Sequence, residues 1–546
     1  MSKEYKHETD LDFASVCYIG GQNFSIFDND QMRSAMQRLH AAYKPPTRQR
    51  IAGPLLDEYY DKVKAIVDEK VLSNKSQYSI NVVTDESTNV TKARISNISL
   101  HTTHGAFYWR SEDIESTQMT AANVASWLKG HLVTLSSGDL QRINSIATDT
   151  CPTMLSAWGC LRACPELRHV FCIPCDSHGI QLLIKDLLSF GCVTDIIAQA
   201  QMVAKTFKNS PLQLSRLRQY QLAAYGEKRT LCLSVITRWG TQYRLVESVL
   251  RNKDALRQYA LKHTPDDIGD EVYEYIDSRT FWTALECLRD LLQPIHEAQK
   301  MSESSKGHLG QVLERWKNIL HHLKRMTNEY PELDEFVRVD GQAGTFASRY
   351  KRQVKPIHIV AFYLTPNNRG VTMTAEHKRN IFEFISEYAS SSEQEKTMQN
   401  EFLYYLNQIK AFELTNICWE NTDDPRIFWL LMRQETEIAQ LAHRIFETPV
   451  NSVASEQAFS IQNAIHTKVR NRLLPERVDK IVYIYRNHRI LKAISSNKRE
   501  PLTIDELSEE EKVDLEDQIL RDLEEDSSEE ERRDVGTEAD LDVMDD

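Results

Sequence analysis

Residues 78–85 read YSINVVTD, a β-branched and largely apolar run that ends on an aspartate. Such a run predicts a buried strand, with the acid at the point where the strand leaves the sheet. Two further runs follow, RISNISLH at 94–101 and AFYWRS at 106–111, divided near Gly105. We expect these three strands to pair antiparallel. A fourth run, INSIATD at 143–149, again ends on an aspartate.

The two strand-end acids, Asp85 and Asp149, are the most informative local feature. In a mixed sheet with the order strand, strand, strand, helix, strand, the first and fourth strands lie adjacent in the RNase H-like arrangement. The two carboxylates would then face each other closely enough to share a divalent cation such as Mg²⁺, which prefers oxygen ligands. A structural alternative stays open, because strand-end aspartates are commonly turn formers or helix caps.

The composition is that of a globular chain, since 41% of the 546 residues are apolar and 27% are charged. No run of about eighteen consecutive apolar residues occurs, which argues against a transmembrane helix. Glycine (18) and proline (16) are scarce, which favours long helices over a turn-rich β architecture. Ten cysteines are too sparse for a disulfide scaffold and indicate a reducing compartment.

The net charge of −13 is distributed unevenly. Residues 501–546 contain 21 Asp and Glu but only 4 Lys and Arg, whereas the rest of the chain contains 58 acids and 62 bases. The body is therefore slightly basic and the tail strongly acidic. A basic body fits nucleic-acid binding, and the tail would oppose it or act only as a solubilising segment.

A resemblance to a known family begins at the C-terminal end. Residues 449–491, PVNSVASEQAFSIQNAIHTKVRNRLLPERVDKIVYIYRNHRIL, resemble the C-terminal dimerisation region of hAT-superfamily transposases. Other segments are similar to that family in the expected order, and the similarity spans about residues 30–495. They are VVTDEST around Asp85, IATDTCPTM around Asp149, the tripeptide Thr237-Arg238-Trp239, and PIHIVAFYLTP at 356–366.

The resemblance implies a DDE triad on Asp85, Asp149 and Glu456. These acids would hold Mg²⁺ or Mn²⁺ for metal-dependent DNA strand cleavage and strand transfer. Glu456 lies some three hundred residues after Asp149 because the family inserts a helical domain into its RNase H-like fold. Without the resemblance, Glu456 could equally be an ordinary acidic residue in the first turn of a helix that Ser452 caps.

The resemblance also implies that Arg238 and Trp239 contact DNA and stabilise a base flipped out of the duplex during hairpin formation. A tryptophan face stacked on an extruded base contributes ~1–3 kcal/mol. The alternative is a half-buried tryptophan on a helix.

Cys175 and His178 are similar to a Cys-x-x-His element of the family, which would put His178 near the scissile phosphate. The same segment permits a zinc site, although a second paired knuckle at a suitable distance is missing. The cysteines that this alternative would use are Cys160, Cys164, Cys172 and Cys175.

The expected fold class is α/β plus α, an RNase H-like mixed sheet with a large inserted all-helical domain and a disordered acidic tail. The expected segments are a disordered arm at 1–30, a helical segment at 31–77, the first part of the RNase H-like catalytic domain at 78–190, the inserted helical domain at 191–430, the final RNase H-like helices with the dimerisation region at 431–495, and the tail at 496–546.

Departures from the family leave two functions open. Ser87 follows Glu86 where many members continue to a Trp, and Gln457 replaces a common Arg. A Cys-x-x-Cys…His-x-H array is missing before residue 80, so we expect no N-terminal BED-type zinc finger. The first hypothesis is an active, nuclear transposase that acts on DNA. The second is a domesticated, non-catalytic regulator that binds DNA.

Under either hypothesis we expect the chain to self-associate through residues 449–495, and we expect no membrane contact. The apolar positions of the last helical pattern favour that region as the contact between protomers, although such a stripe is also typical of an ordinary core. The stripe consists of Leu474, Val478, Ile481, Ile484 and Tyr485.

Overall fold

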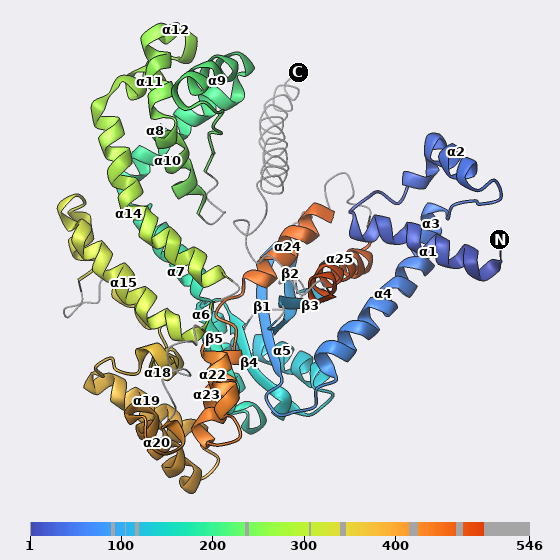
Figure 1. Ribbon diagram of the computed structural model, residues 1–546, viewed down its shortest axis with the longest axis vertical. Helices are drawn as coiled ribbons and strands as arrows, with labels where there is room; N and C mark the ends of the chain where they lie inside the picture. Colours follow the sequence, from blue (N-terminus) through green and yellow to red (C-terminus); the bar gives the residue numbers. More distant parts are fainter. Residues whose placement is uncertain are drawn as a thin grey trace, which may run out of the picture.

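The computed structural model places a small sheet at the centre of a branched, mainly helical molecule (Figure 1). Arg238, Trp239 and the acidic tail lie outside the residues that the structure describes. The described residues are 2–88, 93–103, 105–114, 120–234, 240–304, 307–338, 345–413, 424–465 and 473–495.

The sheet has five strands in the order β3-β2-β1-β4-β5. β1, β2 and β3 pair antiparallel, whereas β4 and β5 run parallel to β1, with Val83 opposite Ala147. The adjacency of the first and fourth strands and the mixed α/β-plus-α class are confirmed. The strands are β1 (Ile80–Thr88), β2 (Arg94–Thr102), β3 (Gly105–Asp113), β4 (Ile143–Thr148) and β5 (Phe171–Pro174).

The sheet separates two hydrophobic cores, because successive side chains of a strand point to opposite faces. Val83 and Ala147 belong to the core shared with the helical region, whereas their neighbours Val82 and Ile146 belong to the other core. The helices nearest the sheet are α5 (Ala121–Leu135), α6 (Pro152–Ala163), α7 (Asp176–Leu187), α24 (Val453–Ile465) and α25 (Pro475–Ser495).

The first thirty residues are largely helical, so the expected disordered arm is wrong. Helix α1 (Lys3–Ile19) packs against α4 (Pro54–Val67) and α25, with Leu11, Ala14 and Tyr18 buried. The Tyr18 hydroxyl donates a hydrogen bond to the carbonyl oxygen of Ile51 at 2.6 Å. Between α1 and α4 lie α2 (Asp30–Leu39) and α3 (Arg48–Ile51).

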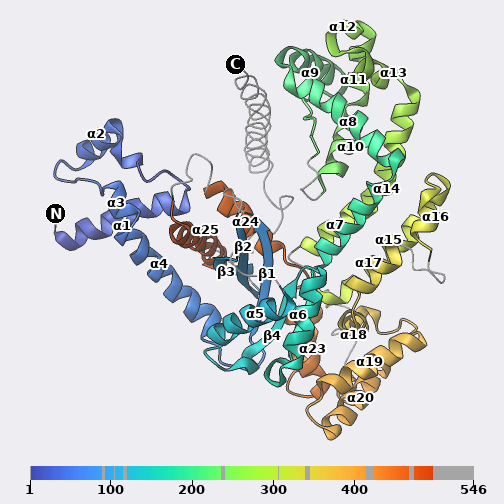
Figure 2. The ribbon, with the colours of Figure 1, turned by 180° about the vertical axis from the view of Figure 1, so that it is seen from behind.

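The described residues between 191 and 447 form helices and no strand. Helix α14 runs from the sheet to a bundle at one end of the molecule, and α18 to α20 lie at the other end (Figures 1 and 2). The bundle consists of α8 (Gly191–Asn209), α9 (Pro211–Tyr225), α10 (Thr241–Arg251), α11 (Lys253–Lys262), α12 (Pro265–Ile268), α13 (Asp270–Asp277) and the first part of α14 (Arg279–Glu303).

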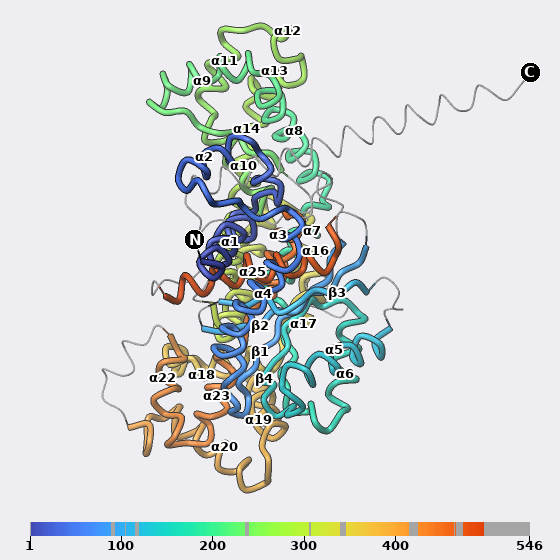
Figure 3. Tube along the Cα trace, turned by 90° about the vertical axis from the view of Figure 1, so that its right-hand side faces the viewer, coloured from blue at the N-terminus to red at the C-terminus, as the bar shows by residue number. Residues whose placement is uncertain are grey.

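The second group of helices follows α14 in the chain, and its members α18 to α20 lie at the end of the molecule opposite the bundle (Figure 1). It contains α15 (Val312–Arg325), α16 (Glu332–Phe336), α17 (Thr345–Gln353), α18 (Pro356–Leu364), α19 (Ala375–Tyr388), α20 (Ser392–Asn407), α22 (Pro425–Met432) and α23 (Glu437–Glu447). Figure 3 shows the bundle above the sheet and α19 and α20 below it. Among the described helices, none is both long enough and apolar enough to cross a membrane.

Helix α25 covers the β3 side of the sheet, and this corrects the expected role of its apolar stripe. Val478, Ile481 and Ile484 are at most 3% exposed, and α25 packs against β3 and α4 of its own chain. The Asn487 side chain also accepts a hydrogen bond from the Tyr108 N–H and donates one to the Tyr108 carbonyl, both at 2.8 Å. These three apolar side chains are therefore not available to a second protomer.

Candidate active site

The two strand-end acids lie at the same end of adjacent parallel strands. The register that pairs Val83 with Ala147 brings Asp85, two residues further along β1, level with Asp149, the residue that follows β4. Asp85 Oδ1 accepts a hydrogen bond from the Glu86 N–H at 2.9 Å, and Asp149 Oδ1 accepts one from the Cys151 N–H at 3.4 Å. Both residues are partly exposed.

Glu456 is brought to the same place through β2. Asn97 pairs with Asp85 in the β1–β2 register, and its side-chain amide donates a hydrogen bond to the carbonyl of Ser455 at 2.8 Å. Helix α24 thereby lies against β1 and β2 with Glu456 in its first turn. Asn451, not Ser452, accepts the hydrogen bond from the Val453 N–H at the start of this helix, at 3.1 Å.

Cys175 joins these elements to the helix that carries His178. Its sulfur accepts hydrogen bonds from the N–H groups of His178 at 3.4 Å and Ser452 at 3.2 Å, and its own N–H donates to the Thr148 carbonyl at 2.7 Å. The thiol therefore caps α7 and at the same time holds the segment before α24. His178 lies near enough to Asp149 for the charge of that acid to act on its imidazole. We call the three acids Asp85, Asp149 and Glu456 the acid edge.

The charges of the acid edge repel one another. Burial, followed by the nearby Asp149 and Glu86 carboxylates, raises the pKa of Asp85 to about 7. Burial and the charges of Asp85 and Glu303 raise the pKa of Glu456 well above its ordinary value. Within the described ranges no lysine or arginine forms an ion pair with any of the three acids.

Burial also lowers the pKa of His178, and Arg349 adds to that effect while Asp149 opposes it. The imidazole is therefore neutral at neutral pH.

A fourth acid, Glu303, comes from the helical region and was not found from the sequence. It is the last residue of α14, and its Oε1 accepts a hydrogen bond from the Ser177 hydroxyl at 2.5 Å. No motif marks Glu303, because only the packing of α14 against α7 brings it here. Asn97 was also missed, although a polar residue within the apolar run 94–101 is a signal that could have revealed it.

The residues of the acid edge fit a divalent cation by their chemistry. Carboxylate oxygens are the ligands that Mg²⁺ and Mn²⁺ prefer, and mutual repulsion favours a cation. Asn97 Oδ1 and Ser455 Oγ are buried beside the acids and have no hydrogen-bond partner among the described residues. No three His, Cys, Asp or Glu side chains in the described part of the chain are close enough to hold one ion, so a bound cation would have to draw the acids together.

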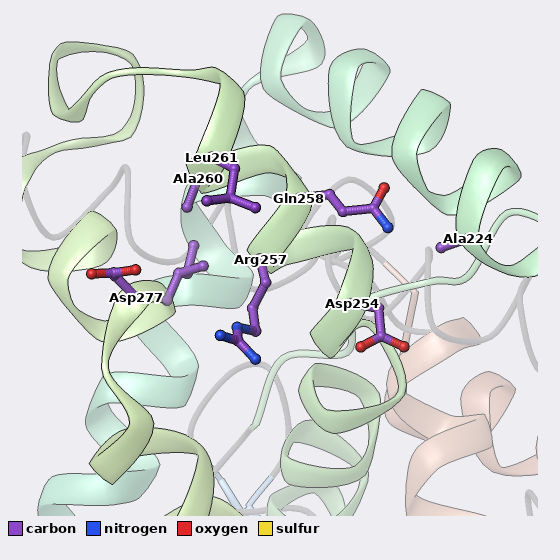
Figure 4. Close-up of a pocket in the computed structure, with 8 residues that line it drawn as sticks. Ala224, Asp254, Arg257, Gln258, Ala260, Leu261 and Asp277 are labelled. Atoms are coloured by element: carbon purple, nitrogen blue, oxygen red, sulfur yellow. The ribbon is translucent and has the colours of Figure 1, made fainter.

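One pocket lies away from the acid edge, in the distal helical bundle. It measures about 350 Å³ and is open to solvent, with Asp254, Arg257 and Gln258 of α11 in its lining (Figure 4). A smaller hollow of about 50 Å³ is lined by Val83 and Ala454, each two residues from a member of the acid edge. None of the three residues of the acid edge lines either pocket. The candidate active site is therefore defined by the chemistry of these carboxyl groups and not by a cavity.

Arg238 and Trp239, the candidate DNA-binding residues, fall in the stretch 235–239 that the structure does not describe, and their role stays a prediction. The described residue that follows them, Gly240, precedes α10 with a φ of 69°.

Three family models match the chain in succession. Residues 46–203 match the family described as Domain of unknown function (DUF659), residues 173–291 match the ZBED1 RNase-like helical domain, and residues 411–488 match the hAT family C-terminal dimerisation region.

A curated relative supports the same assignment. A protein of Zea mays named "Putative AC transposase" is 23% identical over 353 residues, which cover 57% of this chain and 43% of that protein. The chain thus spans less than half the length of this relative. With three family models matched in order and a transposase relative aligned over more than half of its residues, the chain is similar to hAT-family transposases and carries a match to their C-terminal dimerisation region.

Proposed function

We infer that this chain is the core of a DNA transposase that cleaves and joins DNA strands at the acid edge with Mg²⁺ or Mn²⁺. The observation that carries this inference is the convergence of acids from three segments far apart in the sequence. Adjacent parallel strands supply Asp85 and Asp149, and the bond from Asn97 to Ser455 holds Glu456 beside them. Uncompensated carboxylates at one sheet end are costly unless a ligand uses them.

Each group at the site has a definable task. The three carboxylates supply the oxygen ligands, and Cys175 holds α7 and α24 in register with the end of β4. A bound divalent cation would activate the attacking oxygen and stabilise the leaving one in phosphoryl transfer. The neutral imidazole of His178, which lies within the electrostatic influence of Asp149, would contact a phosphate oxygen.

The partners follow from the same inference. Duplex DNA would be the substrate, with Arg238 and Trp239 stacking on a flipped base, and the protein would act in the nucleus. The match of residues 411–488 to a dimerisation region supports self-association. Its contact would then lie in the C-terminal part of the chain, including residues 449–495, outside the buried face of α25.

The test is strand cleavage on DNA ends able to form hairpins, with Mg²⁺ and with Mn²⁺. Asp85→Asn, Asp149→Asn and Glu456→Gln should each reduce cleavage by about 10³-fold or more, and a double variant should be no worse than a single one because the acids act as a unit. Glu86→Gln is the matched control, since Glu86 is paired with Arg94 at 2.8 Å and should retain activity.

Two outcomes would contradict the inference. If Glu456→Gln cleaves as well as the wild-type chain, the triad is wrong at that position. If the wild-type chain is inert on every end with either metal, the domesticated, non-catalytic regulator becomes the better function. The separation of the acids beyond the reach of one ion favours that second candidate.

A further inference from the structure

Helix α22 has apolar side chains all around it, yet it lies at the surface. Phe428, Trp429 and Met432 point inward and are at most 2% exposed. On the outer face Ile427, Leu430 and Leu431 are 56%, 57% and 63% exposed. These three follow one another at intervals of three and one residues, so they form a single stripe, which we call the α22 stripe. A helix that is apolar on every side is ordinarily buried on every side.

The α22 stripe is held on a rigid base. The indole N–H of Trp429 donates a hydrogen bond to the Leu364 carbonyl at 2.8 Å, and its ring lies 5.0 Å from that of Tyr405. Helix α22 also packs against α23. The polar side chain on the helix, Arg426, is turned to Asp424, with which it pairs at 2.7 Å. A stripe fixed in this way loses little conformational entropy when a partner covers it.

The position of the stripe in the chain indicates what covers it. Residues 411–488 match a dimerisation region, and this range contains all of α22 and the first part of α25. The apolar face of α25 is buried within its own chain. Among the described residues of the range, the exposed large apolar side chains are Ile427, Leu430, Leu431 and Leu474. Three of these four form the α22 stripe.

We propose that the α22 stripe is the central contact between two copies of this chain, which meet stripe against stripe about a two-fold axis. A two-fold contact uses the same patch on both partners, and an apolar stripe without a charged side chain is complementary to itself. Three side chains cover less than the ~800 Å² per partner of a standard interface. The stripe is therefore the centre of the interface, where few residues account for most of the affinity, and neighbouring polar residues form its rim.

The proposal rests on the self-association part of the proposed function, and its test needs neither DNA nor metal. The mass of the full chain is measured by light scattering after gel filtration and by sedimentation equilibrium, between about 1 and 50 µM. The wild-type chain should be a dimer. Leu430→Glu and Leu431→Glu each bury a charge at the centre of the contact and should weaken dimerisation by at least about a hundredfold, leaving a monomer.

The matched control is Leu261→Glu, because Leu261 is 78% exposed and lies in the distal bundle, where it should leave the dimer intact. Thermal unfolding checks that the variants are folded, since the replaced side chains contact solvent in the single chain. The proposal is overturned if both stripe variants keep the wild-type mass, if Leu261→Glu dissociates the dimer equally, or if the wild-type chain is a monomer at 50 µM. Strand cleavage, measured separately, is not needed for any of these outcomes.

Discussion

The carboxylate of Asp176 and the carboxylates of the acid edge lie in neighbouring parts of the fold but differ in whether a cationic side chain pairs with them. Asp176, the first residue of α7, is fully buried, pairs with Arg315, and accepts a hydrogen bond from the Trp316 indole N–H at 2.8 Å. The acid edge has no such cationic partner among the described residues. A buried acid with a cationic partner is typical of a structural role, whereas acids without such a partner are the arrangement that a cationic ligand would stabilise.

The paired acid provides the largest expected change in stability. Arg315→Met should lower the free energy of unfolding by about 3–5 kcal/mol, because it leaves the Asp176 carboxylate buried without a counter-charge. The midpoint of urea unfolding measures this loss. Adding Asp176→Asn to Arg315→Met should recover part of it, since the double variant no longer buries an unpaired charge.

Arg338→Met is the control for this loss, because the Arg338 side chain is 56% exposed and its pairing with Asp334 at 3.4 Å should contribute little. An equal midpoint for Arg315→Met and Arg338→Met would contradict a structural role for the Asp176–Arg315 pair. Asp176 is fully buried and is therefore unsuitable as a surface control for the acid edge.

The unpaired acids should respond to metal in place of a counter-charge. Mn²⁺ at about a hundred times its dissociation constant should stabilise the wild-type chain by about 2.7 kcal/mol, because it binds the folded form. Asp85→Asn should lose this gain and should be at least as stable as the wild-type chain without metal, since the repulsion is removed. Differential scanning calorimetry with and without Mn²⁺ measures both effects.

The same scans on Glu86→Gln give the control, which should keep the metal response. Glu86 adjoins Asp85 in β1 but is paired with Arg94. If Mn²⁺ stabilises Asp85→Asn as much as the wild-type chain, the acid edge does not bind the metal.

The sheet could be predicted because its signal is local. The runs 78–85 and 143–149 carry the β-branched pattern and the terminal acids, and the adjacency of the strands places those acids at one end. Helix α1 was missed because its inward side includes Asp10, which interrupts the apolar pattern. Asp10 is 1% exposed and pairs with Lys6 and Arg50, both at 2.8 Å. From the sequence alone, a buried polar residue such as Asp10, whose partner Arg50 is far away in the chain, looks the same as a solvent-exposed residue.

Tertiary packing explains the remaining differences. The spacing of Val478, Ile481 and Ile484 shows that α25 has an apolar face, but not that α4 and β3 of the same chain cover it. Glu303 is equally hidden from sequence reasoning, because its place beside Glu456 depends on the path of α14. Periodicity indicates which side of a helix is buried, whereas the identity of its neighbour depends on the whole fold.

The smallest expected effect is a change in how the free energy of unfolding depends on pH, caused by one buried histidine near the Asp176–Arg315 pair. His358 of α18 is fully buried, its Nδ1 accepts a hydrogen bond from the Lys355 N–H at 3.0 Å, and burial, with Lys355 and Arg315 adding to it, lowers its pKa to about 3. The unfolded chain, with a histidine pKa of about 6.5, therefore binds a proton that the folded chain does not bind between these two values. Stability is fully present above pH 6.5 and falls as the pH is lowered through this window, by about 1.4 kcal/mol from this one group at pH 5.5.

His358→Gln should flatten the dependence of the unfolding free energy on pH by that amount, whereas His321→Gln, at an exposed position of α15, should leave it unchanged. Urea titrations at pH 7.5, 6.5 and 5.5 give the slope of the unfolding free energy against pH for the wild-type chain and for each variant. Comparing slopes removes any loss of stability that the glutamine causes equally at all three pH values. Equal slopes for the wild-type chain and His358→Gln would show that this imidazole is not kept neutral by its surroundings.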